Sequence, residues 1–223
     1  MKQAIVSWSS GKDSAFALSE LLTRGEYDVR ELFTTVQDTH ARVATHGVRE
    51  ELLDQQAAAL GIPLAKIPIP WPCSNVVYEQ RLSEYMGRKQ AEGVTHAAFG
   101  DLFLADIRQY RDAHMATIGM QTLYPLWLRN TTQLAEEMIE SGQKAILVCV
   151  DTRHLPAAFA GREFDARLLA DLPQAVDPCG ENGEFHTFVY ASPIFYNNGG
   201  SLRITRGDTV TRGHVVYTDV LPA

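Results

Sequence analysis

The chain has 223 residues, of which 45% are hydrophobic and 21% are charged, and its formal net charge is −7. This apolar content can build a sizeable core, which excludes a mainly disordered chain, and no apolar run approaches the ~20 residues that cross a bilayer. The acidic balance argues against a basic surface for nucleic acid, and no signal peptide follows the initial methionine, so we expect a cytoplasmic protein without membrane or nucleic-acid partners.

Through the first two thirds of the chain, short apolar runs alternate with stretches whose apolar residues recur at helical spacing. Strands are predicted at residues 4–8, 32–36, 64–69, 97–99 and 145–150. Helices are predicted near residues 15–22, 48–59 and 78–86. Each of these helices is followed by a glycine that can end it. The alternation predicts βαβ units around a mainly parallel sheet.

The C-terminal part of the chain follows a different pattern. Three segments rich in β-forming residues, at 184–190, 201–205 and 214–217, are separated by turn signals at residues 197–200 and 206–208. We therefore expect a smaller mixed α/β lobe appended to the parallel sheet. No repeat, low-complexity tract or obvious linker separates the two lobes, so they are expected to share one compact body.

Cysteine and histidine usage excludes several kinds of site. Cys73, Cys149 and Cys179 form no CxxC pair, which argues against a disulfide scaffold, a zinc ribbon and a thioredoxin-type centre. Cys149 lies in an apolar run and is expected to pack within a strand. Cys73 and Cys179 lie in proline-flanked loops, and the sequence leaves open whether either is near a site. The histidines show no metal-ligand spacing, so no structural zinc is expected.

The most informative segment is Ser-Ser-Gly-Lys-Asp-Ser at residues 9–14, between the first predicted strand and the first predicted helix. Ligands of open α/β sheets bind at the carboxyl ends of the strands, where a helix N-terminus offers N–H groups and the positive end of its dipole to an anion. The small residues Ser9, Ser10 and Gly11 let a phosphate approach the backbone, and Lys12 adds a charged donor. The segment therefore predicts a phosphate site.

Two commoner phosphate loops do not fit this segment. A Walker A loop needs a glycine where Val6 stands, and the Rossmann fingerprint needs three spaced glycines, of which only Gly11 is present. The alternative without any ligand is a helix whose start is capped by Asp13 or Ser14, since both residue types are good caps.

Residues 9–14 resemble the SGGxDS PP-loop of the N-type ATP pyrophosphatases, with Ser10 in place of the first glycine. Further matches resemble the diphthine–ammonia ligase-like group of these proteins. They lie, in order along most of the chain, at residues 46–64, 99–101, 125–127, 161–165 and 180–189. The PP-loop together with the Gly-Glu-x-Gly-Glu-Phe stretch at residues 180–185 makes the resemblance specific.

The resemblance implies a HUP-type α/β fold, that is, a Rossmann-like parallel sheet sandwiched by helices. It implies an ATP-binding domain over residues 1–128 and a smaller C-terminal substrate domain over residues 129–223. Family members use ATP and ammonia to convert the carboxylate of diphthine, on elongation factor 2, into an amide, releasing AMP and pyrophosphate. ATP and Mg²⁺ are therefore the expected cofactors, with ammonia and a carboxylate acceptor as the other substrates. A homodimer is left open.

By the resemblance, the PP-loop binds the pyrophosphate portion of ATP through Ser9, Ser10, Gly11, Lys12, Asp13 and Ser14. Lys12 could stabilise the charge that develops at the α-phosphorus. Asp13 is both a catalytic candidate and a candidate Mg²⁺ ligand. Asp101 follows Gly100 at a strand end on the same sheet edge and could also hold Mg²⁺, directly or through water; an ordinary turn aspartate is the alternative. His46 follows the second strand, where such proteins meet the adenosine.

Glu181 and Glu184 form the second predicted catalytic group. Two carboxylates on a glycine-bracketed turn could bind ammonium and accept its proton as a general base. From the local sequence alone, a solvated acidic turn that enters a strand is the preferred interpretation, and the resemblance reverses that preference.

Three other functions remain open from the sequence. The acceptor could be a carboxylate other than diphthine. A different PP-loop reaction, such as sulfur transfer to tRNA, is opposed by the missing CxxC pairs and the acidic balance. A sensor that binds ATP or AMP without turnover would need neither Glu181 nor Glu184, so these two residues separate it from a ligase.

Overall fold

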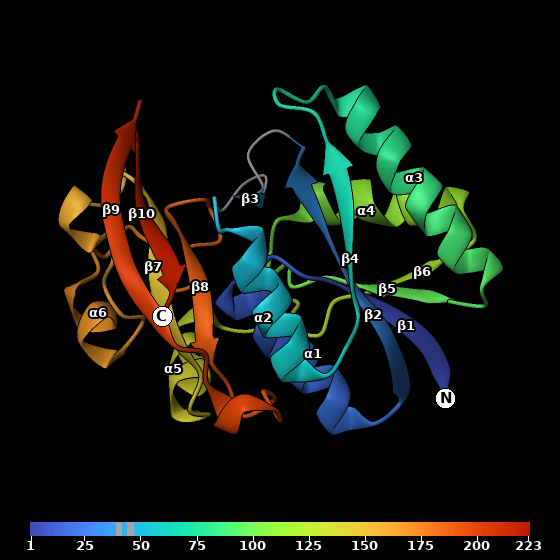
Figure 1. Cartoon of the computed structure of the whole chain (residues 1–223), viewed down its shortest axis with the longest axis horizontal. Coiled ribbons are helices and arrows are strands. Elements are labelled where there is room, and N and C mark those ends of the chain that lie inside the picture. The colour runs from blue at the N-terminus through green and yellow to red at the C-terminus, as the bar shows by residue number, and fades with distance from the viewer. Residues whose placement is uncertain (39–41, 44–46) are drawn as a thin grey trace.

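Two β-sheets stand side by side in the computed structural model, which describes residues 1–38, 42–43 and 47–223 (Figure 1). The first sheet contains β1 (Lys2–Ser7), β2 (Tyr27–Gln37), β3 (Arg42–Val43), β4 (Leu64–Ile69), β5 (His96–Ala98) and β6 (Gln121–Leu123). Its parallel strands run in the order β4-β2-β1-β5-β6, and the short β3 pairs antiparallel with the end of β2. The strand order reverses beside β1, which is where ligands of such sheets bind.

Helices cover both faces of this sheet. α1 (Lys12–Arg24) and α2 (Glu50–Leu60) lie on the face toward the second sheet, and α3 (Asn75–Ala91) and α4 (Ala105–Thr117) lie on the opposite face. Alternation along β1 explains the two layers, because Val6 packs with the first pair and Ile5 with the second. α1 ends where Gly25, at a left-handed φ of 64°, donates its N–H to Leu21 O.

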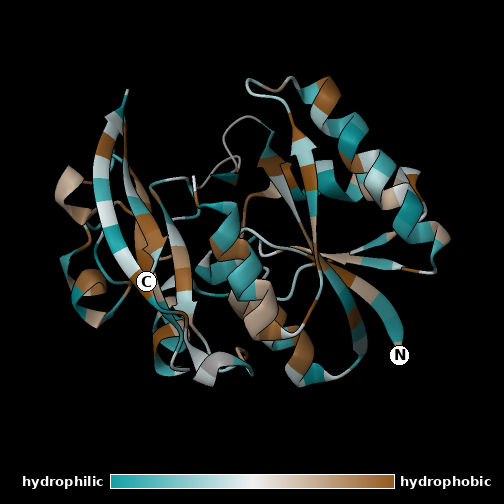
Figure 2. Ribbon diagram, in the orientation of Figure 1, coloured by the Kyte–Doolittle hydropathy of each residue, from teal (hydrophilic) through white to brown (hydrophobic). Residues whose placement is uncertain are grey.

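The second sheet is antiparallel and lies in the C-terminal part of the chain. Its strands β7 (Lys144–Asp151), β8 (Phe185–Ala191), β9 (Ile204–Arg212) and β10 (Val215–Pro222) run in the order β8-β7-β10-β9. The lobe also contains α5 (Thr131–Glu140), α6 (Ala166–Asp171) and the short 3-10 turns η1 (Ala157–Phe159) and η2 (Asn198–Gly200). The outer strand β9 is exposed and mostly hydrophilic (Figure 2), whereas β8 lies against the first lobe.

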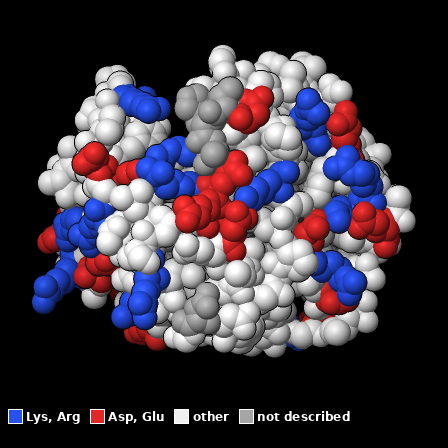
Figure 3. All heavy atoms as spheres, in the orientation of Figure 1, with Lys and Arg blue, Asp and Glu red and all other residues white. Residues whose placement is uncertain are grey.

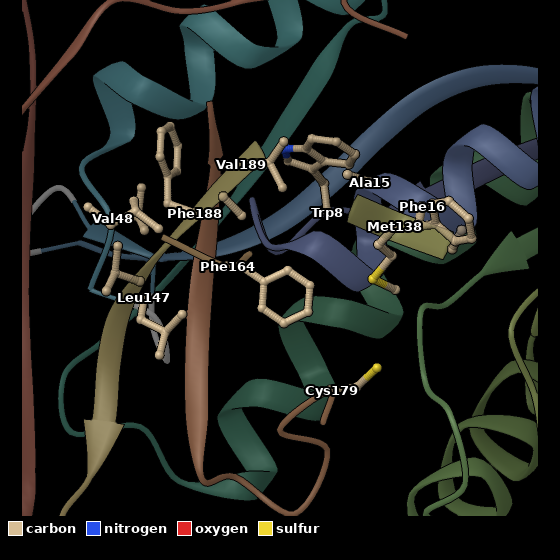
Figure 4. Packing of buried hydrophobic residues seen from close by; sticks show 14 of the residues in the cluster. Trp8, Ala15, Phe16, Val48, Met138, Leu147, Phe164, Cys179, Phe188 and Val189 are labelled. Atoms are coloured by element: carbon tan, nitrogen blue, oxygen red, sulfur yellow. The ribbon is translucent and has the colours of Figure 1, made fainter. Parts of the chain in front are cut away.

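One hydrophobic core crosses the boundary between the lobes. Trp8 and Phe16 of the first lobe belong to the same buried cluster as Met138 and Phe188 of the second (Figure 4). Burial of each such side chain stabilises the fold by about 1.5–3 kcal/mol, so the contact between the lobes is a substantial part of the core. Cys149 is buried in β7, as expected. No helix within the described ranges is both long and apolar enough to cross a membrane.

The predicted fold class is confirmed, with helices on both faces of a mainly parallel sheet and a smaller mixed lobe after it. Two details of the prediction are wrong. The strand at residues 145–150 lies in the antiparallel sheet, as β7. It resembles a parallel strand in sequence because β7 is central and is buried on both faces from its second residue onward.

The predicted turn at residues 206–208 is instead a bulge inside β9. Gly207 and Asp208 together oppose Asp219 of β10, and the actual turn follows at Gly213. A Cβ at position 207 would lie 3.3 Å from Asp219 Cβ, so the glycine allows the close passage of two strands.

Candidate active site

The PP-loop joins β1 to α1 at the carboxyl edge of the parallel sheet. Gly11 is the N-cap of α1 and has no side chain to cap the helix, although Thr187 Oγ1 accepts a hydrogen bond from the N–H of Lys12 at this end. Asp13 and Ser14 lie inside the first turn, so the alternative in which either of them caps the helix does not hold. The hydroxyl of Ser14 donates to Gly11 O (2.9 Å) and lies 3.1 Å from the hydroxyl of Ser9. The N-terminus of α1 and the positive end of its dipole therefore lie at the loop.

Ser10 has the backbone conformation of a glycine. Its φ of 70° is left-handed, which costs an ordinary L-residue about 1–2 kcal/mol, and explains why the related loops carry glycine here. The side chain is fully buried, and its Oγ has no hydrogen-bond partner among the residues described. The serine therefore keeps the shape of the loop.

The C-terminal lobe reaches the PP-loop through β8. The N–H of Val189 donates to Ser10 O (2.9 Å), and the N–H of Lys12 donates to Thr187 Oγ1 (3.0 Å). The amide of Gln56 joins the same contact, because its Nε2 donates to Ser10 O (3.1 Å) and to Val189 O (2.7 Å). Strand β8 thus fixes the loop from the far side of the lobe boundary.

Lys12 points into the interior between the lobes. Its Nζ lies 2.8–2.9 Å from both carboxylate oxygens of Asp13, donates to Cys179 O, and lies within 5.5 Å of the ring centroids of Phe164 and Phe185. Burial alone would lower the pKa of Lys12, but the charge and hydrogen bond of Asp13 together with the nearby Cys179 and Glu181 outweigh it, and the pKa is raised. Lys12 is therefore an ammonium bound to Asp13, and its contact with a phosphate stays a prediction.

The loop after β5 touches the first turn of α1. A Cβ on Gly100 would lie 3.0 Å from the carbonyl carbon of Asp13 and 3.1 Å from Ser14 N, so only glycine permits this approach. The contact places Asp101 beside the helix N-terminus. Asp101 accepts a hydrogen bond from Arg111 of α4 (Nη2 to Oδ1, 3.2 Å), so it is held in place rather than free in a turn.

Glu181 lies near enough to both Asp13 and Asp101 to interact with their charges. Its Oε1 accepts a hydrogen bond from Leu102 N (2.7 Å). Burial raises the pKa of Glu181 to about 7, the Leu102 N–H opposes this rise, and the charges of Asp13 and Asp101 add to it. The structure thus brings three of the predicted site carboxylates together at the start of α1.

Glu184 has a different environment. Its side chain is only 2% exposed, and its Oε1 accepts hydrogen bonds from Asp177 N and Asn182 Nδ2, both at 3.0 Å. Within the described part of the chain, Oε2 has no hydrogen-bond partner. The interpretation of this residue as part of a solvated turn is therefore wrong, and Glu184 holds the loop at residues 177–184 in shape.

Several residues at the site were not singled out by the sequence. The side chain of Gln143 donates to Lys12 O (3.1 Å), and the carboxylate of Asp177 accepts from the N–H groups of Cys179 and Glu181. His186 lies near enough to Lys12 for that charge, after burial, to lower its pKa to about 4. His46, predicted at the adenosine, lies outside the described residues.

The carboxylates near α1 fit Mg²⁺ bound together with phosphate. Oxygen ligands suit this cation, which usually takes one or two protein carboxylates and completes its shell with phosphates and water. Asp101 Oδ2 lies 2.9 Å from Arg111 Nε, so a cation at this carboxylate would share it with the guanidinium. Over the same residues, no cluster of three or more His, Cys, Asp and Glu side chains is arranged to hold a metal ion without other ligands.

A cavity of about 290 Å³ lies between the lobes at the ends of β2 and β4. Its lining includes Gln37 and Trp71 from the first lobe and Val210 and Tyr217 from the second. Acidic and basic side chains adjoin one another across the middle of the face seen in Figure 3. The volume is near the lower end of the range for small-molecule sites.

The sequence was compared with protein families and with known proteins. Residues 1–122 match the family described as diphthamide synthase N-terminal domain, and residues 130–213 match the diphthamide synthase C-terminal domain. A diphthine–ammonia ligase of Danio rerio is 27% identical over 84% of this chain and 81% of its own length, and that of Bos taurus is 25% identical over 84% and 78%. The human diphthine–ammonia ligase is 31% identical over 48% of this chain and 41% of its own length.

A solved structure, titled a predicted subunit of tRNA methyltransferase from Methanocaldococcus jannaschii, superposes with a TM-score of 0.40 at 15% identity, over 71% of this chain and 84% of that one. A likeness of this size does not bear on function. The two family matches cover most of the chain and confirm the resemblance found in its motifs. The chain therefore belongs to the diphthamide synthase family.

Proposed function

We propose that the protein is an ATP-dependent ligase that adenylates a carboxylate and then converts it to an amide with ammonia. The observation that carries the proposal is the convergence of Asp13, Asp101 and Glu181 at the start of α1. Such a site offers N–H groups to phosphate, carboxylates to a cation, and a base that titrates near neutral pH.

The reaction has two steps, because a carboxylate has no good leaving group for ammonia to displace. In the first, an acceptor oxygen bonds to the α-phosphorus of ATP, and the bond from that phosphorus to the bridging oxygen breaks, so that pyrophosphate leaves with the electron pair. In the second, ammonia bonds to the acyl carbon, AMP leaves, and one proton passes from nitrogen to a base. Preorganised donors and exclusion of water favour both steps.

Each step has suitable residues at the start of α1. The first turn of the helix would bind the phosphates, and Mg²⁺, held by Asp13 and Asp101, would neutralise their charge. Glu181, with a pKa of about 7, is divided between acid and carboxylate at neutral pH, which suits a general base. Glu184 supports this role by holding the loop that carries Glu181.

The relatives supply the proposed acceptor. Their shared name, diphthine–ammonia ligase, names diphthine and ammonia as substrates. We extend this to the present chain, with residues 1–128 binding ATP and residues 129–223 contributing to the acceptor site. Elongation factor 2 as carrier of the acceptor, a homodimer and a cytoplasmic location stay predictions.

The test measures the two half-reactions separately. ATP–pyrophosphate exchange reports adenylation, and amide formation on diphthine-bearing elongation factor 2 with ammonium reports the complete reaction. Glu181→Gln keeps an acceptor for Leu102 N–H but cannot take up a proton, so we expect exchange to persist while amide formation falls by at least about 100-fold. Glu184→Gln is expected to abolish amide formation while ATP binding persists, because a neutral amide accepts from Asp177 N and Asn182 Nδ2 less strongly than a carboxylate does and holds the loop of Glu181 less firmly.

Other results would remove parts of the proposal. Full amide formation by Glu181→Gln would exclude Glu181 as the base, and full turnover by Glu184→Gln would remove Glu184 from the mechanism. ATP binding without pyrophosphate release on any carboxylate would favour the non-catalytic sensor.

A further inference from the structure

The amide of Gln56 lies where the two lobes and the PP-loop meet. Gln56 belongs to α2, and its side chain is fully buried. Its Oε1 accepts a hydrogen bond from the indole Nε1 of Trp8 (2.8 Å), and its Nε2 donates to Ser10 O (3.1 Å) and to Val189 O (2.7 Å). An indole N–H can only donate and a carbonyl can only accept, so the three bonds fix both the plane of the amide and the side on which its nitrogen lies.

Two donors hold the carbonyl of Ser10. One is the side chain of Gln56, and the other is the N–H of Val189, at 2.9 Å. Ser10 lies in the PP-loop and Val189 in β8, so the carbonyl points at the edge of a strand from the other lobe. The direction of this carbonyl is therefore fixed by α2 and β8 together.

The direction of Ser10 O determines the direction of the next N–H in the loop. The peptide group between Ser10 and Gly11 is trans, and the C=O and N–H of a planar trans peptide point in opposite directions. The N–H of Gly11 therefore points away from β8, where Ser9 Oγ accepts it at the long distance of 3.3 Å. Gly11 is the N-cap of α1, so this N–H lies at the end of the helix that offers donors to an anion.

Glycine at position 11 makes this peptide group easy to reverse. Glycine populates positive and negative φ about equally, so Gly11 itself opposes a reversal only weakly. The reversed group would present the carbonyl oxygen of Ser10 to a phosphate, and the two would repel each other. The loop therefore needs donors that keep Ser10 O directed toward β8.

We propose that Gln56 is a positioning residue of the phosphate site, which holds the Ser10–Gly11 peptide group so that the N–H of Gly11 faces the pyrophosphate portion of ATP. Val189 O shares the same amide, so the shape of the PP-loop depends on the contact with the second lobe. This inference rests on the proposed function and adds a residue that acts on ATP through the loop.

Two substitutions divide the bonds of the Gln56 amide. Gln56→Glu keeps an acceptor for Trp8 but places an oxygen where Nε2 donated to Ser10 O and Val189 O, so it replaces two attractions by repulsion. Trp8→Phe is the matched control, because it removes the bond to Oε1 and leaves both bonds of Nε2. Both variants lose buried hydrogen bonds, so an effect of lower stability alone would appear in both.

Calorimetry of the whole chain measures the dissociation constants of pyrophosphate, ATP and AMP, each with Mg²⁺. AMP lacks the pyrophosphate portion and serves as the reference. Because two hydrogen bonds are lost, Gln56→Glu at about pH 8 is expected to weaken pyrophosphate and ATP by roughly 10- to 100-fold and to leave AMP unchanged. Trp8→Phe is expected to change none of the three. Gln56→Met loses both bonds without repulsion, so its affinities should lie between those of the wild type and Gln56→Glu, and it carries the test if the glutamate variant does not fold.

A pH series separates positioning from a general loss of packing. A protonated carboxyl group has an O–H that can donate to one of the two carbonyls, and burial favours this neutral form. The loss of pyrophosphate affinity in Gln56→Glu, relative to the wild type at the same pH, should therefore shrink as the pH falls from about 8 to about 5. Gln56→Met introduces no titratable group, so its loss relative to the wild type should stay constant.

Three outcomes would overturn the assignment. Unchanged pyrophosphate affinity in Gln56→Glu would show that Gln56 does not set the shape of the loop. An equal loss for AMP would mean that Gln56 supports the fold and not the phosphate site in particular. A loss of the same size in Trp8→Phe would mean that a loosened core is responsible. Failure of the proposed function looks different, because a wild type that binds pyrophosphate and ATP but forms no amide refutes the ligase and leaves the comparison of pyrophosphate with AMP valid.

Discussion

Two charged clusters join the lobes, and they differ in how much water reaches their cations. In the Lys12 cluster, the ammonium of Lys12 binds the carboxylate of Asp13 and the carbonyl of Cys179; Lys12 is 2% exposed and Asp13 is 28% exposed. In the Asp219 cluster, the carboxylate of Asp219 binds Arg42 and Arg49, and these three side chains are 22–40% exposed. Both clusters link a residue of the first lobe to one of the second.

The difference in exposure separates the roles of the two clusters. Removing one partner from a buried ion pair leaves an unpaired charge without solvent, whereas water and salt compensate for the loss at a partly exposed pair. The Lys12 cluster is therefore expected to fix the conformation at the start of α1. The Asp219 cluster is expected to add only a modest attraction between lobes that the shared core already joins.

The largest expected effect follows from removing the buried ammonium. Lys12→Met leaves the carboxylate of Asp13, which is 28% exposed, without its charged partner. Breaking a fully buried pair costs about 3–5 kcal/mol, so we expect a loss at the lower end of this range. At roughly 2–4 °C per kcal/mol for a chain of this size, the Tm should fall by about 10 °C. Thermal unfolding monitored by circular dichroism measures this directly.

A double variant provides the control for this prediction. Lys12→Met with Asp13→Asn removes both charges, so we expect it to recover most of the lost Tm, because no unpaired charge remains buried. A double variant that is no more stable than Lys12→Met would show that packing of the lysine, and not its charge, supports the site.

A second prediction concerns Glu181, which lies close to the same cluster. Its pKa is raised to about 7, chiefly by burial, so the folded state holds its proton more tightly than the unfolded chain does. Its stabilising contribution is complete below the unfolded pKa and is lost as the pH rises through 7. We expect Glu181→Gln to match the wild type near pH 4 and to gain on it by up to about 3 kcal/mol by about pH 8.

The measurement is the Tm of both proteins across that pH range. The glutamine side chain of the variant can still accept the hydrogen bond from Leu102 N, so the comparison isolates the charge. A difference in Tm that does not change with pH would place the carboxylate in contact with water at all pH values.

The sequence predicted the parts of this site that form one continuous motif. Residues 9–14 follow a strand and open a helix, and local spacing is enough to show that. Glu181 and Glu184, by contrast, look alike in sequence, and only the folded loop separates the carboxylate near Asp13 from the one bound to Asp177 N. The bond from Lys12 to Cys179 O joins residues 167 positions apart, which no local pattern encodes.

The same reasoning explains which elements were missed. α4 buries only Met115, so it lacks the apolar stripe that predicts a helix, and Arg111 is carried on it. β6 has three residues, which are too few to show the alternation of buried and exposed side chains that predicts a strand. α5 was also missed, although its Leu134, Ala135 and Met138 lie at helical spacing and are buried in the core.

The smallest expected effect belongs to the Asp219 cluster. Burial alone would raise the pKa of Asp219, but its hydrogen bonds with Arg49 and Arg42 outweigh this and lower it. The stabilisation is therefore present at neutral pH and is lost as the pH falls through the folded pKa. Because water reaches all three side chains, Asp219→Asn should cost only about 1 kcal/mol, or about 2–4 °C in Tm.

The dependence of the two stability losses on salt concentration tests whether exposure separates the two clusters. Raising the ionic strength from about 0.1 M to about 1 M shortens the screening length from roughly 10 Å to 3 Å, so the difference between Asp219→Asn and the wild type should shrink toward zero. The loss in Lys12→Met should change less over the same range, because salt ions do not reach the buried ammonium of Lys12. If instead Asp219→Asn cost as much as Lys12→Met at both ionic strengths, exposure would not be what separates the two clusters, and Asp219 would have to be counted with the buried framework of the site.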